Sequence, residues 1–348
     1  MTNQAAYAIL TKSRAKYGKR LTPSNYRELL SCGSVAEVAS YLKSHTHFSS
    51  ALEGIQESAV HRGNLEALLK GKIFADFAEL CRFERSIGEH YFEYLLLRGE
   101  VDELLNFLRY FNAGKASEYL FALPGFFNKH TSLNLIGLSQ AKTFHQVVDV
   151  LKDTPYSRIL APFEPLDGQA LEFADIEAAL DRYLISRSME IMRINFIGKT
   201  RDKLLGLIAF KAELDNIRRI YRAKLYYNVP VDAIRAQLIN IRHYLKKAEL
   251  EELLTSSDAL QMQKRLAGTR YGRLEKGMNY ETIDETAVRL QFNYCRSLMR
   301  TSGEPAVVMA ATVVLFEVEV ENVTNIIEGI RYHVSSDEIR KLLVAASE

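Results

Sequence analysis

Apolar and polar residues alternate along most of the chain with the period of an α-helix. Within residues 204–224, four apolar residues recur at spacings of four, three and four, which places them on one helix face: Phe210, Leu214, Ile217 and Tyr221. Asp215 and Arg219 are spaced for an i,i+4 ion pair, so we expect this pair on a solvated face. Residues 175–192 and 231–254 have similar patterns. The sequence therefore predicts an all-α protein.

A short motif occurs three times, in residues 97–104, 210–217 and 316–323. Its pattern is apolar-x-x-Glu-apolar-acid-polar-apolar. Glu100, Glu213 and Glu319 occupy the same position of the motif, at spacings of 113 and 106 residues. This period is too long for a solenoid and fits three homologous helical domains.

Two further elements recur in the same order. Leucine, threonine, an aromatic residue and leucine follow one another from residues 42, 151 and 266, with one extra residue in the first copy. Acidic residues at Glu66, Glu177 and Asp284 precede the motif glutamates by 34, 36 and 35 residues. We predict helical repeats at 1–120, 121–229 and 230–348, with connections near 115–130 and 228–231.

One segment favours a different secondary structure when it is considered alone. Residues 306–323 are rich in valine and threonine, and their intrinsic propensity favours a strand. The corresponding segment of the second repeat, 204–224, has a clear helical pattern. Propensity is a weak prior, so we predict a helix here as well.

Charge and cysteine content exclude several classes of protein. The 45 Lys and Arg residues nearly balance 43 Asp and Glu residues, which argues against a dominant nucleic-acid-binding role. Three widely separated cysteines indicate neither a disulfide framework nor a cysteine-rich zinc site, and favour a reducing cytoplasm. The longest nearly apolar stretch, 306–316, is too short to cross a bilayer. We expect no secretory signal and no direct membrane span.

The sequence contains only weak candidates for catalytic motifs. Gly198-Lys199-Thr200 resembles the end of a phosphate loop but has Arg193 where the first glycine is required. His45 and His47 could suggest a metal site, but a polar turn is favoured. The basic run of Arg218, Arg219, Arg222 and Lys224 fits either a partner surface or, preferably, a solvated face balanced by Glu213 and Asp215. We predict no catalytic, cofactor-binding or metal-binding residues, and no cofactor.

The motif glutamates themselves allow two interpretations. Carboxylates on a helix could bind Mg²⁺ in a helical enzyme. However, an enzyme needs one asymmetric site, whereas these acids occur in three similar copies. We expect each glutamate to be partly buried and bonded to backbone donors at the start of a neighbouring helix, which would join the first and third segments of each domain.

The threefold arrangement resembles the family of C subunits of V-type and A-type ATPases, whose eukaryotic relative is the d subunit. The residues that carry the resemblance are Tyr7-Ala8, Lys12 to Ala15, Leu151 to Tyr156 and Ala212 to Lys224, the last containing Glu-Leu-Asp-Asn-Ile-Arg at 213–218. The resemblance covers the whole chain. The first copy departs from it, because Glu103 replaces the asparagine found at Asn216 and Asn322, and Gly99 interrupts the helix.

This resemblance implies three helical-bundle domains around a pseudo-threefold axis, forming a funnel. It implies a non-catalytic central-stalk adaptor, cytoplasmic and peripheral to the membrane, whose partners are the central-shaft subunits and the ring of membrane rotor subunits, and which transmits torque for proton or sodium transport. The isolated chain would be a monomer and would bind no nucleic acid. The alternatives are an unrelated helical scaffold and a Mg²⁺-dependent helical enzyme.

Overall fold

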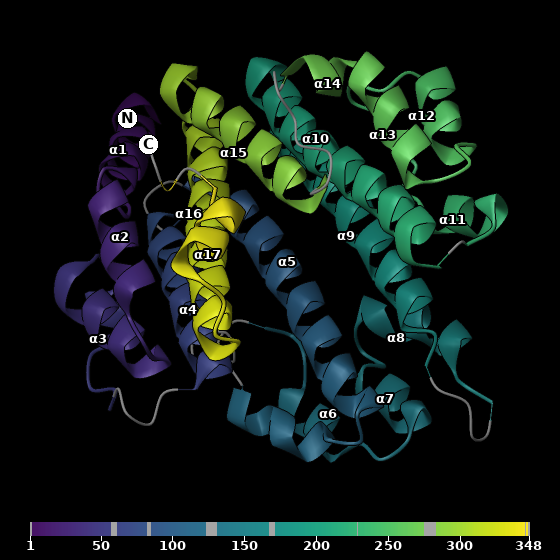
Figure 1. The fold of residues 1–348 in the computed structure, drawn as a ribbon, viewed down its shortest axis with the longest axis horizontal. Helices are drawn as coiled ribbons and strands as arrows, with labels where there is room; N and C mark the ends of the chain where they lie inside the picture. Colours follow the sequence, from purple (N-terminus) through teal and green to yellow (C-terminus); the bar gives the residue numbers. More distant parts are fainter. Residues whose placement is uncertain are drawn as a thin grey trace. The chain divides into compact units, whose positions relative to one another are not determined.

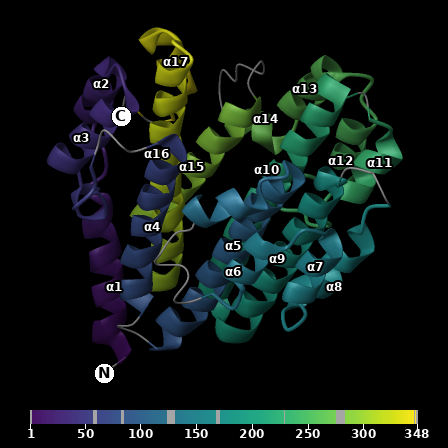
Figure 2. The same ribbon diagram turned by 90° about the horizontal axis from the view of Figure 1, so that it is seen from below.

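The computed structural model describes residues 2–56, 61–81, 85–122, 131–166, 171–227, 229–274, 283–344 and 346. Within these residues all regular secondary structure is helical, as predicted, and no strand occurs. The chain divides into two compact units: residues 1–91, 197–207 and 274–348 form unit 1, and residues 92–196 and 208–273 form unit 2. Figures 1 and 2 show the elements of each.

Unit 1 is built from both ends of the chain. Its elements are α1 (Thr2–Tyr17), α2 (Pro23–Ser31), α3 (Val35–His45), η1 (Ser49–Ala51), α4 (Arg62–Cys81), α15 (Ile283–Thr301), α16 (Pro305–Arg331) and α17 (Ser336–Leu342), together with the first parts of α5 (Arg85–Asn112) and α10 (Gly198–Arg222). Helices from the two ends of the sequence therefore share one core.

Unit 2 contains the remaining parts of α5 and α10 and the elements between them and after them. These are η3 (Ala116–Ala122), α6 (Leu135–Gln140), α7 (Phe144–Val150), α8 (Pro155–Leu160), η5 (Ala161–Phe163), α9 (Phe173–Asn195), η6 (Ala223–Tyr227, a π-helical turn), α11 (Val231–Gln237), α12 (Lys247–Leu254), α13 (Ala259–Gly268) and α14 (Arg270–Leu274). Long helices thus alternate with groups of short ones.

The valine-rich segment 306–323 is helical, as its place in the repeat predicted. It forms most of α16, which begins with Pro305 at its first position, where the absent N–H costs nothing. α1, α4, α15 and α17 all pack against α16 (Figures 1 and 2), and its side chains are buried around the whole circumference. This burial outweighs the modest preference of β-branched residues for strands.

Helix α10 confirms the predicted apolar face but not the predicted ion pair. Its four periodic apolar residues are all buried. Arg219 instead binds Asp181 of α9, with Nη2 and Oδ2 2.9 Å apart, and donates to the carbonyl oxygen of Gln237. Asp215 pairs with Lys211 at 2.8 Å. The predicted pairing of Arg219 with Asp215 was therefore wrong. Spacing along one helix could not identify Asp181 as the partner, because Asp181 lies on a different helix, α9.

The division into two compact units does not test the boundaries of the three predicted repeats. The proposed boundary at 120/121 falls within η3, and residues 123–130 of that connection lie outside the described part of the chain. The boundary at 229/230 follows residue 228, which is also outside it. The three-domain division stays a prediction.

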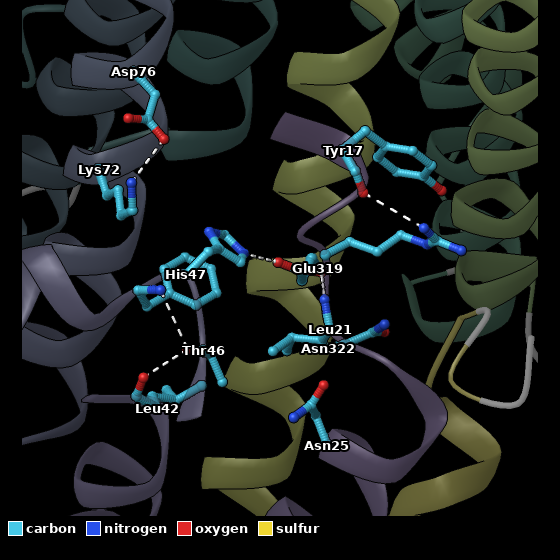
Figure 3. A network of polar contacts seen from close by, with 12 residues as sticks. Tyr17, Leu21, Asn25, Leu42, Thr46, His47, Lys72, Asp76, Glu319 and Asn322 are labelled. Atoms are coloured by element: carbon cyan, nitrogen blue, oxygen red, sulfur yellow. Dashed lines mark hydrogen bonds and ion pairs between the residues drawn. The ribbon is translucent and has the colours of Figure 1, made fainter. Parts of the chain in front are cut away.

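Helices α1 and α4 are joined by a carboxylate with two ammonium partners. Asp76 lies 2.8 Å from Lys72 Nζ, a contact drawn in Figure 3, and 3.0 Å from Lys16 Nζ of α1. Burial acts to raise the pKa of Asp76, but the hydrogen bonds and charges of Lys72 and Lys16 outweigh it and hold the pKa below its usual value. The charged carboxylate therefore stabilises the folded state.

This pair predicts a pH-dependent effect of Asp76→Asn. A carboxyl group whose pKa is lower in the folded state stabilises the fold above its unfolded pKa and loses this contribution as the pH falls through its folded pKa. We expect Asp76→Asn to lower the free energy of unfolding by about 1 kcal/mol at pH 7, and the difference from wild type to shrink between about pH 5 and pH 2. Urea unfolding at a series of pH values measures this. Asp337→Asn, at an exposed pair with Arg340, is the control and should show a smaller change.

Candidate functional site

The three motif glutamates are buried, as the sequence predicted. Glu100, Glu213 and Glu319 are 7%, 2% and 5% exposed. A carboxylate removed from water is costly unless donors surround it. The contacts of each glutamate therefore define what the repeated motif does.

Glu213 has the most complete set of donors. The backbone N–H groups of His243, Tyr244 and Leu245 all donate to its two carboxylate oxygens, at 2.7–3.2 Å. The Tyr271 hydroxyl donates to Oε2 at 2.6 Å. The three N–H groups belong to the loop that leads into α12. Glu213 thus holds one long helix to the start of a group of short helices.

Glu100 makes an analogous set of contacts. The backbone N–H of Ser132 donates to Oε1 at 2.8 Å, and the hydroxyls of Ser132 and Thr131 donate to the same oxygen at 2.9 and 3.0 Å. The Tyr156 hydroxyl donates to Oε2 at 2.9 Å. Burial and the neighbouring negative charge raise the pKa of Tyr156, so this hydroxyl keeps its proton.

Glu319 closes the series with residues from the N-terminal part of the chain (Figure 3). The backbone N–H of Leu21, in the loop before α2, donates to Oε2 at 2.6 Å. The His47 ring nitrogen Nε2 lies 2.5 Å from Oε1. Both partners are within unit 1, and they fix the N-terminal helices against α16.

The recurring threonine of the second sequence element caps the preceding helix in all three copies. The hydroxyls of Thr46, Thr154 and Thr269 donate to the carbonyl oxygens of Leu42, Leu151 and Leu266 at 2.6, 2.7 and 2.7 Å. In the second and third copies the backbone N–H of the same threonine also donates to that carbonyl oxygen, at 2.8 and 3.0 Å, so both groups of the threonine close the helix end. The recurring leucine and threonine therefore mark a helix end.

The aromatic residue two positions after this threonine points to the glutamate in two copies. Tyr156 and Tyr271 donate their hydroxyls to Glu100 and Glu213. In the first copy the residue is Phe48, which has no hydroxyl, and the adjacent His47 supplies the contact with Glu319. The imidazole thus replaces the phenol at the same type of site.

The asparagine of the motif forms a second repeated contact. Asn216 accepts from the Ile239 N–H at 2.9 Å and donates to the Ile239 carbonyl at 2.8 Å. Asn322 makes the same pair of bonds with Val344, at 2.9 and 2.7 Å. Each amide thereby completes both hydrogen bonds of one backbone residue. The carboxylate and the amide, three residues apart, hold two separate points of the chain against one helix.

Comparison with known proteins identifies the family of this chain. The family model described as ATP synthase (C/AC39) subunit matches residues 9–342. The chain belongs to this family. It is 22% identical over 344 residues to the C subunit of the A-type ATP synthase of Methanosphaera stadtmanae, covering 95% of this chain and 86% of that protein. It is 30% identical over 192 residues to the C subunit of the A-type ATP synthase of Pyrococcus horikoshii, covering 52% of this chain and 49% of that protein.

In this member of the ATP synthase (C/AC39) family, the glutamates join neighbouring predicted repeats. Glu100 of repeat 1 binds residues 131, 132 and 156, which belong to repeat 2. Glu213 of repeat 2 binds residues 243, 244, 245 and 271 of repeat 3. Glu319 of repeat 3 binds residues 21 and 47 of repeat 1. The prediction that each acid joins the first and third segments of its own repeat was therefore wrong. Bonding to backbone donors was predicted correctly, but these donors lie in the loops just before α2, α6 and α12 and not in the first turns of those helices.

Two acids of the third sequence element, Glu66 and Glu177, have a different role from the buried glutamates. Glu66 forms ion pairs with Lys70 at 2.8 Å and Arg62 at 3.5 Å, and Glu177 lies 3.8 Å from Arg109. These side chains are partly exposed, so the pairs contribute little to stability. These acids recur at the same position of the repeat, but their contacts do not form a functional site.

The basic run at the end of α10 is engaged within unit 2. Arg218 lies 3.5 Å from Asp215, and Lys224 donates to the carbonyl oxygen of Ser256. Glu213 is buried among its own donors and does not balance these charges. The predicted solvated face is thus only partly correct, because Arg219 also binds Asp181.

The weak chemical motifs have structural partners. His45 stacks on Tyr41 with ring centroids 4.8 Å apart, and His47 binds Glu319. The segment before Gly198-Lys199-Thr200 is helix α9, and the Thr200 hydroxyl donates to Glu304 at 2.7 Å. In the described part of the chain, no cluster of three or more His, Cys, Asp or Glu side chains is arranged to hold a metal ion. None of the helices described there has both the length and the apolar character needed to cross a bilayer.

Proposed function

We propose that this chain is the non-catalytic central-stalk adaptor of a V/A-type rotary ATPase, which couples the rotating shaft to the membrane rotor ring during proton or sodium transport. The family match over residues 9–342 carries the proposal. The two relatives named above are both C subunits of A-type ATP synthases by name, which supports it. We further propose that the three repeats form a funnel that receives the shaft.

The repeated contacts suit a part that transmits torque. A coupling element must not deform when force is applied to one side, so its helices need fixed relative positions. Glu213 and Asn216 each bond loop backbone to α10, and Glu319 and Asn322 do the same for α16. Buried, fully bonded polar groups make a packed core stiffer and its arrangement unique.

The chemistry of the glutamates also supports a structural role. Both oxygens of Glu213 accept hydrogen bonds from protein groups, and the same holds for Glu100. A carboxylate that ligates Mg²⁺ must offer an oxygen to the ion. We therefore favour the adaptor over the Mg²⁺-dependent enzyme.

Affinity purification from native membranes tests the adaptor role. We expect a tagged version of this chain to recover shaft and rotor-ring subunits of the ATPase after mild detergent extraction. The purified chain alone should neither bind nor hydrolyse ATP. Recovery of no ATPase subunits, with other partners enriched instead, would favour the unrelated helical scaffold. We also propose that the chain lies in the cytoplasm and is held at the membrane through the complex. The same negative result would contradict this location.

A further inference from the structure

Two segments of unit 1 carry basic residues and no acidic ones. Residues 1–27 contain no Asp or Glu and six basic residues: Lys12, Arg14, Lys16, Lys19, Arg20 and Arg27. Residues 286–303 likewise contain no acid, and their basic residues are Arg289, Arg296 and Arg300. In the whole chain Lys and Arg barely outnumber Asp and Glu, 45 to 43. The imbalance in these segments is therefore local.

The fold brings the two segments together. Arg14 of α1 donates to the carbonyl oxygens of Met299, Arg300 and Ser302, at 3.3, 3.4 and 3.0 Å. Lys203, at the start of α10 and also within unit 1, donates to the Ser302 hydroxyl at 3.1 Å. Cationic side chains from three separate elements thus meet at the end of α15.

Aromatic rings hold two more of the guanidinium groups. Arg20 lies over the ring of Tyr17, 4.8 Å from its centroid, and Arg296 lies over Phe292 at 5.2 Å. Burial and the positive charges of Arg300 and Arg20 lower the pKa of Arg296. We name Arg14, Arg20, Arg296 and Arg300 the arginine patch.

Three carboxylates of unit 1 are bonded to groups outside the patch. Glu319 is bound by Leu21 and His47, and Glu304 accepts from Thr200. Asp76 is shared by Lys16 and Lys72. Capping of the α15 carbonyl groups explains Arg14, since a cation at a helix C-terminus is favourable. It does not explain why Arg20, Arg296 and Arg300 are gathered beside it.

Like charges held together destabilise an isolated protein and attract an oppositely charged partner. We propose that the arginine patch is a docking surface for an acidic segment of another subunit of the ATP synthase. This inference depends on the proposed function, since it names the chemistry by which one of the adaptor's contacts is made.

The chemistry of the patch favours a protein partner over a lipid surface. Its cations are arginines of α1, of the turn that follows it and of α15, and their planar guanidinium groups can form two parallel hydrogen bonds with a carboxylate. Arginine and tyrosine are enriched at protein interfaces. Segments that bind anionic lipids are commonly continuous lysine- and arginine-rich runs beside a membrane segment or on an amphipathic helix, whereas this patch joins α1, the turn that follows it and α15, which are distant in the sequence.

The test measures binding of the purified full chain to ATP synthase from which this subunit has been removed. The variant is Arg20→Glu with Arg300→Glu, both of which are exposed. The control is Lys264→Glu with Arg273→Glu, two exposed basic residues of unit 2 with the same change in charge. We expect association of the patch variant to slow by about tenfold at low salt, with a weaker dependence on salt, while the control binds like wild type. Circular dichroism and thermal melts confirm that both variants fold.

Three results would overturn the inference. If the patch variant and the control bind the depleted complex equally, the patch is not a docking surface, while the adaptor role stands. If wild type itself does not bind the depleted complex, the proposed function fails with it. In a parallel arm, flotation with vesicles of phosphatidylcholine and phosphatidylglycerol should not recover the chain. Flotation that is lost in the patch variant would assign the patch to lipid instead.

Discussion

Replacing Glu213 with alanine is expected to lower the free energy of unfolding by about 3 kcal/mol. The substitution leaves the N–H groups of His243, Tyr244 and Leu245 and the hydroxyl of Tyr271 without their acceptor. Each buried donor left unpaired costs about 1–3 kcal/mol, although local rearrangement and water recover part of this. Equilibrium urea unfolding followed by circular dichroism measures the loss.

Several variants separate this effect from a general sensitivity of the fold. Glu177→Ala removes a partly exposed acid of another repeated element and should cost less than about 0.5 kcal/mol. Glu213→Gln keeps one acceptor oxygen and should fall between wild type and Glu213→Ala. Glu100→Ala and Glu319→Ala should destabilise less than Glu213→Ala, because each glutamate accepts from one backbone N–H and not three. Unchanged stability of Glu213→Ala would mean that this carboxylate has another purpose.

Asn322→Asp is expected to destabilise unit 1 by about 3 kcal/mol at pH 7, although the side chains have almost the same shape. The amide of Asn322 both accepts from the Val344 N–H and donates to the Val344 carbonyl. A carboxylate cannot donate, so it would place a buried negative charge beside a carbonyl oxygen. Thermal and urea unfolding give the size of the loss.

The pH dependence of this variant provides a second, independent check. A carboxyl group that is protonated can donate again, and burial favours its neutral form. Asn322→Asp should therefore recover part of its stability, relative to wild type, as the pH is lowered toward about 4. Asn216→Asp should behave in the same way, since its contacts with Ile239 are the same. Asn293→Asp, exposed on α15 beside Arg296, is the control and should be neutral. Equal losses at pH 4 and pH 7 would contradict this explanation.

Helices and repeated acids could be predicted because their signals are local or periodic. The pattern of residues 204–224 predicted α10, and its recurrence at 306–323 predicted α16 against the strand propensity of that segment. Recurrence at three places also identified Glu100, Glu213 and Glu319 as one structural position. A buried acid needs donors whatever the fold, so its bonding to backbone N–H groups followed from solvation alone.

The grouping of segments into repeats could not be predicted in the same way. A repeated sequence gives the period but not the point at which a unit starts, because every shift along the chain has the same spacings. Glu319, in the last motif, binds Leu21 and His47 near the start of the chain, and the period alone does not give this pairing. Only contacts between distant residues contain this information.

His47 and the partners of the asparagines were missed for similar reasons. The recurring pattern matches Phe48 with Tyr156 and Tyr271. Nothing in the sequence shows that His47, the residue before Phe48, contacts the glutamate where the other copies use a tyrosine hydroxyl. Ile239 and Val344 use only their backbone groups, so their side chains carry no signal. Contacts made by the main chain do not leave a pattern in the sequence.

The closure of unit 1 by the two ends of the chain has a consequence for synthesis. Glu100 and Ser132 are 32 residues apart, so both are made within roughly 2–6 s at 5–20 residues per second. His47 and Glu319 are 272 residues apart, and the same rates separate them by roughly 15–50 s. Throughout this interval the N-terminal helices exist without α16, the helix against which their apolar faces are buried. The newborn chain therefore exposes its first helices throughout this interval, and this is the period in which chaperones would bind it.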